Sequence, residues 1–257
     1  MPVTAKVIRL EPNGPEGAGL TPLHLDPADF QSPLPEQNYH LYFTDPAIGL
    51  NVGIWDTTTM QEAFGPYPGD EFILVLTGAF SMLDAKDKGV PAKAGDLVAF
   101  RNGAPMSWKQ EGYLKKFYLT LRKPEAEPPV IETAVIETAE GGVAVIDPAS
   151  DLTDDDILAE SEGTGSGAVE REVIFFKNDA GTMTVGLWDC QAFDGAEMTP
   201  FPCHEFVVMA AGEVTILEPD GVAQTFGPGD AFFVPKGTLC SWHVPDYIRK
   251  FYAAIGS

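Results

Sequence analysis

Short apolar and aromatic runs, broken by Gly, Pro and Asp at spacings of about ten residues, fill most of the chain. The clearest runs are residues 72–80, 96–100, 205–218 and 231–235. This pattern predicts an all-β fold, an antiparallel sandwich or barrel. In residues 71–76 and 205–210 both alternating positions are apolar. A strand with one face in water would alternate, so these strands are expected to be covered on both faces.

The pattern occurs twice, because the chain aligns with itself over a long stretch. Glu71 aligns with Glu205 and Gly78 with Gly212, inside the two related phrases PYPGDEFILVLTGA and PFPCHEFVVMAAGE. Other aligned segments are 52–60 with 185–193, 96–100 with 230–234, 107–108 with 241–242, and 115–118 with 249–252. Two tandem domains follow from this alignment.

The boundary between the domains is expected near residue 125. Residues 122–142 are rich in Pro, Glu and small residues, as a linker is. We therefore predict an N-terminal barrel with an N-terminal arm over 1–125, and a C-terminal barrel that includes the linker and its own arm over 126–257.

Each copy resembles the cupin barrel, also called a double-stranded β-helix or jelly roll. The first cupin motif ends in Glu, six residues and Gly, a spacing that both Glu71 to Gly78 and Glu205 to Gly212 have. Gly229, Pro235 and Gly237 fit the second motif. The sequence looks most like a bicupin of the RmlC-like superfamily, from the subgroup related to ureidoglycine aminohydrolase and the ethanolamine-utilisation cupin.

The resemblance implies a divalent metal held by His-x-His and Glu of the first motif and His of the second. The N-terminal copy keeps only Glu71, with Met106 in the second-motif His position, so no cofactor is expected there. The C-terminal copy offers a candidate metal set with zinc, manganese or iron as the possible ion. That set is Cys203, His204, Glu205 and Cys240.

Strand alternation opposes this metal set. If Glu205 points into the barrel, Cys203 points the same way and His204 the opposite way. The alternative is that Cys203 and Cys240 are small buried hydrophobic residues, and that His204 is a hydrogen-bonded histidine at a barrel rim. The residues alone leave both interpretations open.

A carboxylate inside a barrel without a metal needs a positive partner. Lys116 and Lys250 recur in the last strand of each copy, so we predict that Glu71 pairs with Lys116 and Glu205 with Lys250. Such pairs beside tryptophans would form polar pockets, in which Glu205 and Lys250 are the candidate catalytic residues. The candidate ligand-binding residues are Glu71, Lys116, Tyr67, Trp108, Trp242 and Cys240.

Two functions are consistent with these residues. In the first, the bicupin binds a small polar metabolite in a barrel pocket, and its metal site is degenerate. The alternative, implied by the resemblance, is a metal-dependent enzyme like ureidoglycine aminohydrolase that acts in the C-terminal barrel, a hydrolase of a small ureide or amino-bearing metabolite.

The net charge of the chain limits the kinds of partner that it is expected to bind. The formal net charge of -22 disfavours nucleic acid and anionic membranes. Three cysteines and no apolar segment of signal-peptide length predict a cytoplasmic protein with free thiols. The expected partners are a small-molecule ligand and, from the family habit of pairing, a second copy in a homodimer.

Overall fold

The computed structural model describes residues 5–122, 141–159, 167–195 and 197–256. These residues form antiparallel strands and three short 3-10 turns, as the all-β prediction requires. They divide into two compact units. We call residues 10–148 the N-terminal barrel, and residues 149–257 with 1–9 the C-terminal barrel.

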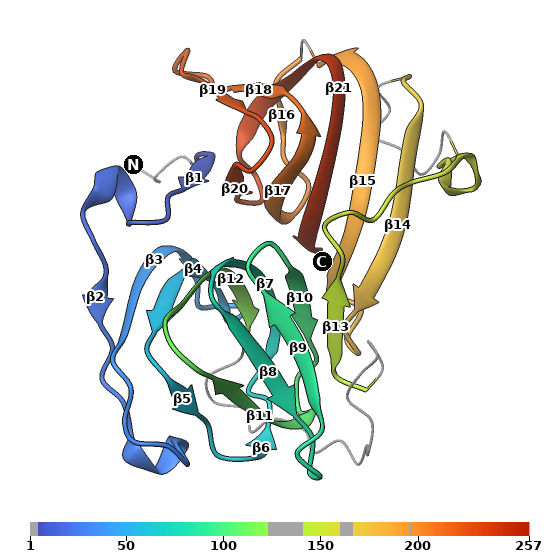
Figure 1. Ribbon diagram of the computed structural model, residues 1–257. Helices are drawn as coiled ribbons and strands as arrows, with labels where there is room; N and C mark the ends of the chain where they lie inside the picture. Colours follow the sequence, from blue (N-terminus) through green and yellow to red (C-terminus); the bar gives the residue numbers. More distant parts are fainter. Residues whose placement is uncertain (1–4, 123–140, 160–166, 196, 257) are drawn as a thin grey trace. The chain divides into compact units, whose positions relative to one another are not determined.

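The N-terminal barrel has two antiparallel sheets (Figure 1). One runs in the order β13-β10-β7-β12-β4-β3-β2, and the other β5-β11-β8-β9, with β6 also paired to β11. The bounds are β2 Thr21–Pro22, β3 Gln37–Asp45, β4 Leu50–Thr57, β5 Met60–Gln61, β6 Gly65–Pro66, β7 Asp70–Thr77, β8 Ala79–Leu83, β9 Gly89–Lys93, β10 Leu97–Phe100, β11 Pro105–Gln110, β12 Leu114–Leu121 and β13 Val143–Ile146, with turns η1 Pro15–Gly17 and η2 Pro27–Asp29.

The inner faces of these two sheets pack into one core. Val75 of β7, Phe80 of β8 and Trp108 of β11 belong to the same buried cluster. Residues 70–75 of β7 are all buried, so both faces of this strand are covered as predicted. Side chains therefore fill much of the barrel, and any ligand space must lie beside this core.

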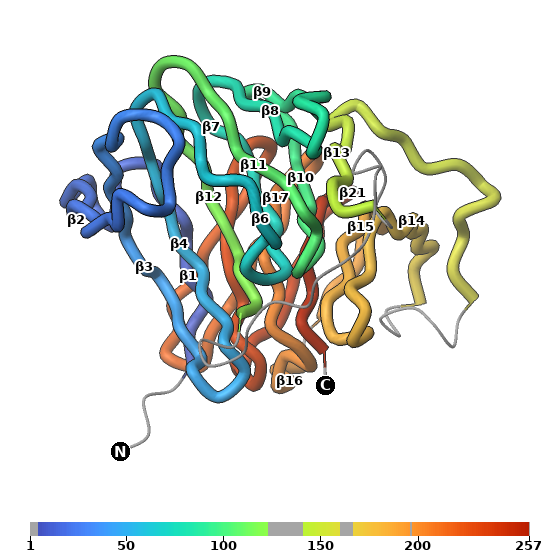
Figure 2. The backbone as a smooth tube through the Cα atoms, turned by 90° about the horizontal axis from the view of Figure 1, so that it is seen from below, coloured from blue at the N-terminus to red at the C-terminus, as the bar shows by residue number. Residues whose placement is uncertain are grey.

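The C-terminal barrel repeats the arrangement, with strands in the order β1-β20-β17-β21-β15-β14. Strands β16 and β18 also pair with β21, and β19 pairs with β18. The bounds are β1 Ile8–Leu10, β14 Glu170–Lys177, β15 Met183–Asp194, β16 Thr199–Pro200, β17 His204–Gly212, β18 Val214–Leu217, β19 Ala223–Phe226, β20 Ala231–Val234 and β21 Leu239–Ile255, with turn η3 Asp154–Asp156. In both views β14 lies beside β15 (Figures 1 and 2).

One difference between the copies has a local cause. The N-terminal barrel ends β11 and begins β12 after a break, whereas β21 continues through the same place. Gly112 in the break has a φ of 79°, a conformation that L side chains rarely adopt. Asp246 occupies the aligned position in β21 without a positive φ. The chain therefore stays extended there.

The two arms pair with strands of the other barrel from the one to which a division at residue 125 would assign them. Strand β1 lies next to β20 in the C-terminal barrel, where Val7 joins the core. Strand β13 pairs with β10 in the N-terminal barrel. Each arm supplies a partner to a strand edge that would otherwise be unpaired. Residues 123–140, most of the predicted linker, lie outside the described part of the chain.

None of the helical segments in the described ranges has the length and apolar character needed to cross a bilayer.

Candidate functional site

A buried ion pair lies inside the N-terminal barrel. Lys116 Nζ of β12 donates to Glu71 Oε1 of β7 at 2.9 Å, and the side chains are only 9% and 8% exposed. This confirms the predicted pairing of Glu71 with Lys116. In β12, Thr120 lies opposite Glu71, and Lys116 stands four residues earlier on the same face. The long lysine stem therefore reaches along the sheet to the carboxylate.

Two tryptophans enclose the lysine ammonium. Lys116 Nζ lies 5.0 Å from the ring centroid of Trp55 and 4.6 Å from that of Trp108. Trp55 donates through Nε1 to Gln37 Oε1 at 3.2 Å, and Trp108 to Gln110 Oε1 at 2.9 Å, which fixes both indoles. Their π-faces interact favourably with the buried cation.

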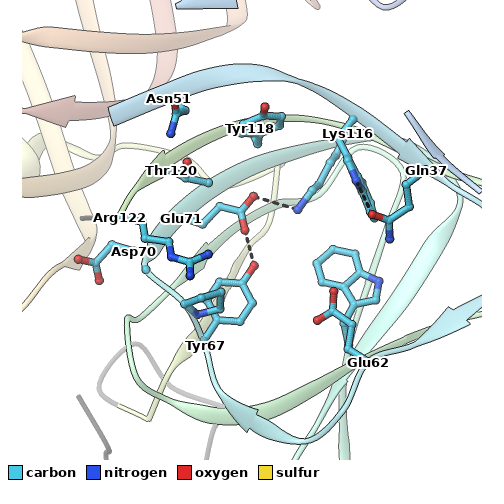
Figure 3. A pocket seen from close by; sticks show the side chains of 14 residues that line it. Gln37, Asn51, Glu62, Tyr67, Asp70, Glu71, Lys116, Tyr118, Thr120 and Arg122 are labelled. Atoms are coloured by element: carbon cyan, nitrogen blue, oxygen red, sulfur yellow. Dashed lines mark hydrogen bonds and ion pairs between the residues drawn. The ribbon is translucent and has the colours of Figure 1, made fainter. Parts of the chain in front are cut away.

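The second oxygen of Glu71 is also bound. The Tyr67 hydroxyl donates to Glu71 Oε2. Burial and the neighbouring carboxylate of Glu71 raise the pKa of Tyr67, so its hydroxyl remains a protonated donor at neutral pH. Glu71 is thus held between an ammonium and a phenol (Figure 3).

A cavity of about 580 Å³ opens beside this ion pair. Four of the predicted ligand-binding residues, Glu71, Lys116, Tyr67 and Trp108, line it. Its wall consists of Gln37, Asn51, Trp55, Glu62, Tyr67, Pro68, Gly69, Asp70, Glu71, Trp108, Lys116, Tyr118, Thr120 and Arg122 (Figure 3). The volume is typical of sites for small molecules.

Glu62 is a wall residue that sequence reasoning missed. It follows β5, and its backbone is fixed by hydrogen bonds from its N–H to Trp108 O and from the Ser107 hydroxyl to its carbonyl. Its carboxylate has no hydrogen-bond partner among the described residues. Burial raises the pKa of Glu62 to about 7, and the charges of Glu71 and Asp29 act in the same direction while Lys116 opposes them. Both protonation states are therefore populated near neutral pH.

The alignment of the two copies carries no signal for Glu62. Recurring residues stand out in such an alignment, and Glu62 aligns with Gly195, which has no side chain, although Asp194 is its neighbour. Its half-buried position beside Trp108 is a property of the fold, because residues 58–66 lead from β4 into the second sheet.

The cavity wall also contains a cation, Arg122. Arg122 follows β12 directly, and its guanidinium has no ion pair or hydrogen bond with other described residues. Figure 3 shows its side chain on the side of the cavity occupied by Glu71 and Tyr67. Thr120 and Asn51, which lie opposite each other in β12 and β4, also line this end. An exposed cation with two uncharged polar neighbours is suited to a carboxylate.

The C-terminal barrel has a matching ion pair. Lys250 Nζ donates to both oxygens of Glu205, at 2.8 and 2.9 Å, which confirms the second predicted pairing. Its ammonium lies 5.0 Å from the ring centroid of Trp188 and 5.1 Å from that of Trp242. The duplication has therefore preserved a Glu-Lys-Trp-Trp arrangement in both barrels.

The copies differ around this arrangement. Phe201 replaces Tyr67 and has no hydroxyl to donate, and it stacks on Trp242 with ring centroids 5.6 Å apart. Trp242 Nε1 is buried and has no hydrogen-bond partner among the described residues. Ala254 and Gly256 stand where the N-terminal barrel has Thr120 and Arg122. The polar end of the cavity is thus specific to the N-terminal copy.

The predicted metal ligands do not come together. In the described parts of the chain no group of three or more His, Cys, Asp or Glu side chains could hold an ion. His204 points to the face opposite Glu205, where its ring stacks on Phe233 and its Nδ1 accepts from the Lys236 backbone N–H at 3.1 Å. Consecutive side chains of a strand point to opposite faces of the sheet, and His204 and Glu205 are consecutive in β17. The set of Cys203, His204, Glu205 and Cys240 was therefore wrong as a ligand cluster.

The thiols also do not suit a metal. Burial and the charge of Glu205 raise the pKa of Cys203 to about 12. Burial also raises the pKa of the Cys240 thiol. Thiols bind metals as thiolates, which are disfavoured here. The two oxygens of Glu205 already accept from Lys250, so the residues present do not fit the metal that the cupin family implies.

We expect Glu62→Gln to stabilise the protein at alkaline pH. Because the folded-state pKa of Glu62 is raised from 4.5 to about 7, the folded protein favours the protonated form, and stability is lost as pH rises through this window. At pH 8 the variant should exceed wild type by up to about 3 kcal/mol in unfolding free energy, and at pH 4 the two should agree. Urea unfolding at both pH values measures this.

Glu111→Gln is the matched control, because Glu111 is an exposed carboxylate of the same barrel. It should leave stability unchanged at both pH values. An equal stability of Glu62→Gln and wild type at pH 8 would show that the Glu62 carboxylate is solvated.

Comparison with known proteins identifies the class of fold. Residues 177–252 match the family model of the EutQ-like cupin domain. A solved structure from Pseudomonas syringae pv. tomato strain DC3000, a protein of unknown function in family DUF861, superposes with a TM-score of 0.72 at 21% identity, covering 97% of this chain and 99% of that one. A candidate dioxygenase from Nostoc punctiforme PCC 73102 has a TM-score of 0.65 at 12% identity, covering 100% of this chain and 84% of that one.

YlbA from E. coli, another DUF861 protein, has a TM-score of 0.54 at 14% identity, covering 99% of this chain and 93% of that one. No curated protein sequence matches the chain. At these identities the structural similarity concerns the fold. Residues 177–252 thus resemble the EutQ-like cupin domain, and the chain as a whole has the fold of two cupin barrels.

Proposed function

We propose that this bicupin binds a small polar metabolite carrying a carboxylate, and that the ligand occupies the cavity of the N-terminal barrel. The observation that carries the proposal is the cavity of about 580 Å³, with a guanidinium at one end that pairs with no described residue. Arg122 would pair with the carboxylate, and Thr120 and Asn51 would complete its hydrogen bonds. The aromatic wall of Trp55 and Trp108 would exclude water from the remainder of the ligand.

The internal charges support a polar ligand without competing for its carboxylate. Glu71 and Lys116 neutralise each other, so the interior contributes a fixed dipole and little net charge. Asp70 accepts from the Asn102 backbone N–H at 3.0 Å. Glu62 faces the cavity as a carboxyl group that can be neutral or charged. A ligand with a carboxylate at one end and a polar group at the other would use both Arg122 and Glu62.

The metal-dependent alternative in the C-terminal barrel has less support. It requires a metal at Glu205, and the neighbouring described donors neither converge nor favour the thiolate form. Glu205 and Lys250 as catalytic residues remain a prediction, and no contact described above favours them over a structural ion pair.

Arg122→Gln tests the proposed site. Titration of the wild-type protein with 2-oxobutanoate, followed by calorimetry and by tryptophan fluorescence, should give one site per chain. The variant should bind at least about tenfold more weakly, because a charge-assisted hydrogen bond contributes about 1.5 to 3 kcal/mol. Arg122 is exposed, so its replacement should leave the stability unchanged.

Lys109→Gln is the matched control, since Lys109 is an exposed cation of β11 that does not line the cavity. It should bind 2-oxobutanoate as the wild type does. Equal affinity of the Arg122→Gln variant and the wild type, or no binding to the wild type at millimolar ligand, would refute the proposed site.

A further inference from the structure

We propose that the N-terminal cavity is a proton-transfer site, in which Glu62 removes and returns a proton on the carbon next to the keto group of a small 2-oxo carboxylate. This inference rests on the proposed function, because the same cavity must bind the acid. It adds a reaction, a substrate class and a catalytic residue to that binding site.

The position of Glu62 differs from that of the other carboxylates in the cavity wall. Of the carboxyl groups in the described cavity wall, Glu71 is bound by Lys116 and Tyr67, and Asp70 by Asn102. Glu62 alone among these three carboxylates faces the space without a hydrogen-bond partner from the described residues. Its backbone is fixed at both the N–H and the carbonyl. Such a carboxylate on a fixed backbone can reach a ligand, whereas the other two already have partners.

The protonation equilibrium of Glu62 also suits a general base. The groups that face Glu62 are Lys116 from β12, Glu71 of β7, Tyr67 just before β7, and Asp29 from η2. Burial, as the largest cause, and the charges of Lys116, Glu71 and Asp29 leave Glu62 with a pKa of about 7. A general base is most effective when its pKa lies near the working pH, because it is then both ionised and basic enough to accept a proton.

Two cations lie in the same cavity wall as Glu62. Arg122 would hold the carboxylate of the ligand at one end, and Lys116 lies in the same wall with one of its three N–H groups donated to Glu71. The ammonium is close enough to Glu62 for its charge to lower the pKa of that carboxyl. A keto group placed beside Lys116 would therefore have its adjacent carbon near Glu62.

The reaction needs no co-reactant. Glu62 carboxylate takes a proton from the carbon next to the keto group, the C–H electron pair becomes the C=C bond of the enolate, and the C=O pair moves onto oxygen. Lys116 stabilises this oxyanion by a hydrogen bond. Protonated Glu62 then returns a proton to the same carbon. The net result is enolisation and reprotonation, and in D₂O each cycle replaces hydrogen by deuterium.

The test is deuterium exchange followed by proton NMR. The full-length protein is mixed with 2-oxobutanoate in D₂O, and the loss of its C3 methylene signal is compared with the rate in buffer. We expect exchange above the buffer rate that increases with pH through the pKa of Glu62. Glu62→Gln should reduce the protein-dependent rate at least about 100-fold, and Glu62→Asp should retain part of it.

Glu111→Gln, an exposed carboxylate of the same barrel, should exchange at the wild-type rate. Binding is measured by tryptophan fluorescence on the same samples. If the acid binds and wild type gives no exchange, or if Glu62→Gln exchanges as fast as wild type, the proton-transfer proposal is overturned while the binding site stands. If neither binding nor exchange occurs, both the site and the reaction are overturned.

Discussion

Lys250→Met should lower the free energy of unfolding by about 3 to 5 kcal/mol, the cost of leaving one partner of a buried pair without its counter-charge. Glu205 would lose both of its hydrogen bonds to the ammonium, and its side chain is only 9% exposed. Lys116→Met should have a similar effect on the N-terminal barrel, slightly smaller because Tyr67 still donates to Glu71. Urea unfolding at pH 7 measures both.

The double variant Glu205→Gln with Lys250→Met separates two contributions to stability. One is the net contribution of the ion pair, and the other is the cost of leaving one charge buried without its partner. Removing both charges should recover most of the lost stability, because buried ion pairs contribute little relative to neutral groups. Lys109→Met, at an exposed site, should change stability by less than about 0.5 kcal/mol. A loss below about 1 kcal/mol for Lys250→Met would show that water reaches Glu205 in the folded barrel.

Gly212→Ala should destabilise the C-terminal barrel by at least about 4 kcal/mol, among the larger effects of a single substitution. Gly212 has a φ of 74°, and a Cβ there would lie 1.8 Å from the carbonyl oxygen of Tyr247. That oxygen belongs to the backbone of β21, so the clash requires two strands to move apart. Thermal unfolding followed by circular dichroism measures the effect.

Gly237→Ala is the matched control, because Gly237 has a φ of 82° and a Cβ added there would have no described atom within 4 Å. It should cost only about 1 to 2 kcal/mol, from the left-handed backbone alone. Similar losses for the two variants would mean that strand separation at Gly212 is easy. The close approach of β21 to Gly212 explains why a glycine stands at this position of the first motif.

The repeat made the fold and the ion pairs predictable. Two copies that share a motif spacing identify the barrel, and a buried carboxylate that recurs with a lysine indicates the pairing from the sequence alone. The pairings of Glu71 with Lys116 and of Glu205 with Lys250 were both confirmed. Recurrence was informative here because the two barrels impose the same electrostatic requirement.

The self-alignment could not identify functional residues that are present in only one of the two copies. Glu62 and Arg122 have no charged counterpart in the C-terminal copy, so the self-alignment could not select them. Cys203 and His204 drew attention to the C-terminal barrel because of their chemistry, but side-chain direction and the raised thiol pKa exclude them as part of a metal cluster among the described residues. The partners of the two arms could not be predicted either, since strand pairing across a linker leaves no local pattern.

The most direct test of the N-terminal site is a crystal structure of the protein soaked with 2-oxobutanoate. We expect one molecule in the cavity beside Glu71 and Lys116, with its carboxylate within hydrogen-bond distance of the Arg122 guanidinium. A ligand bound in the C-terminal barrel beside Glu205 and Lys250, with only solvent in the N-terminal cavity, would contradict it.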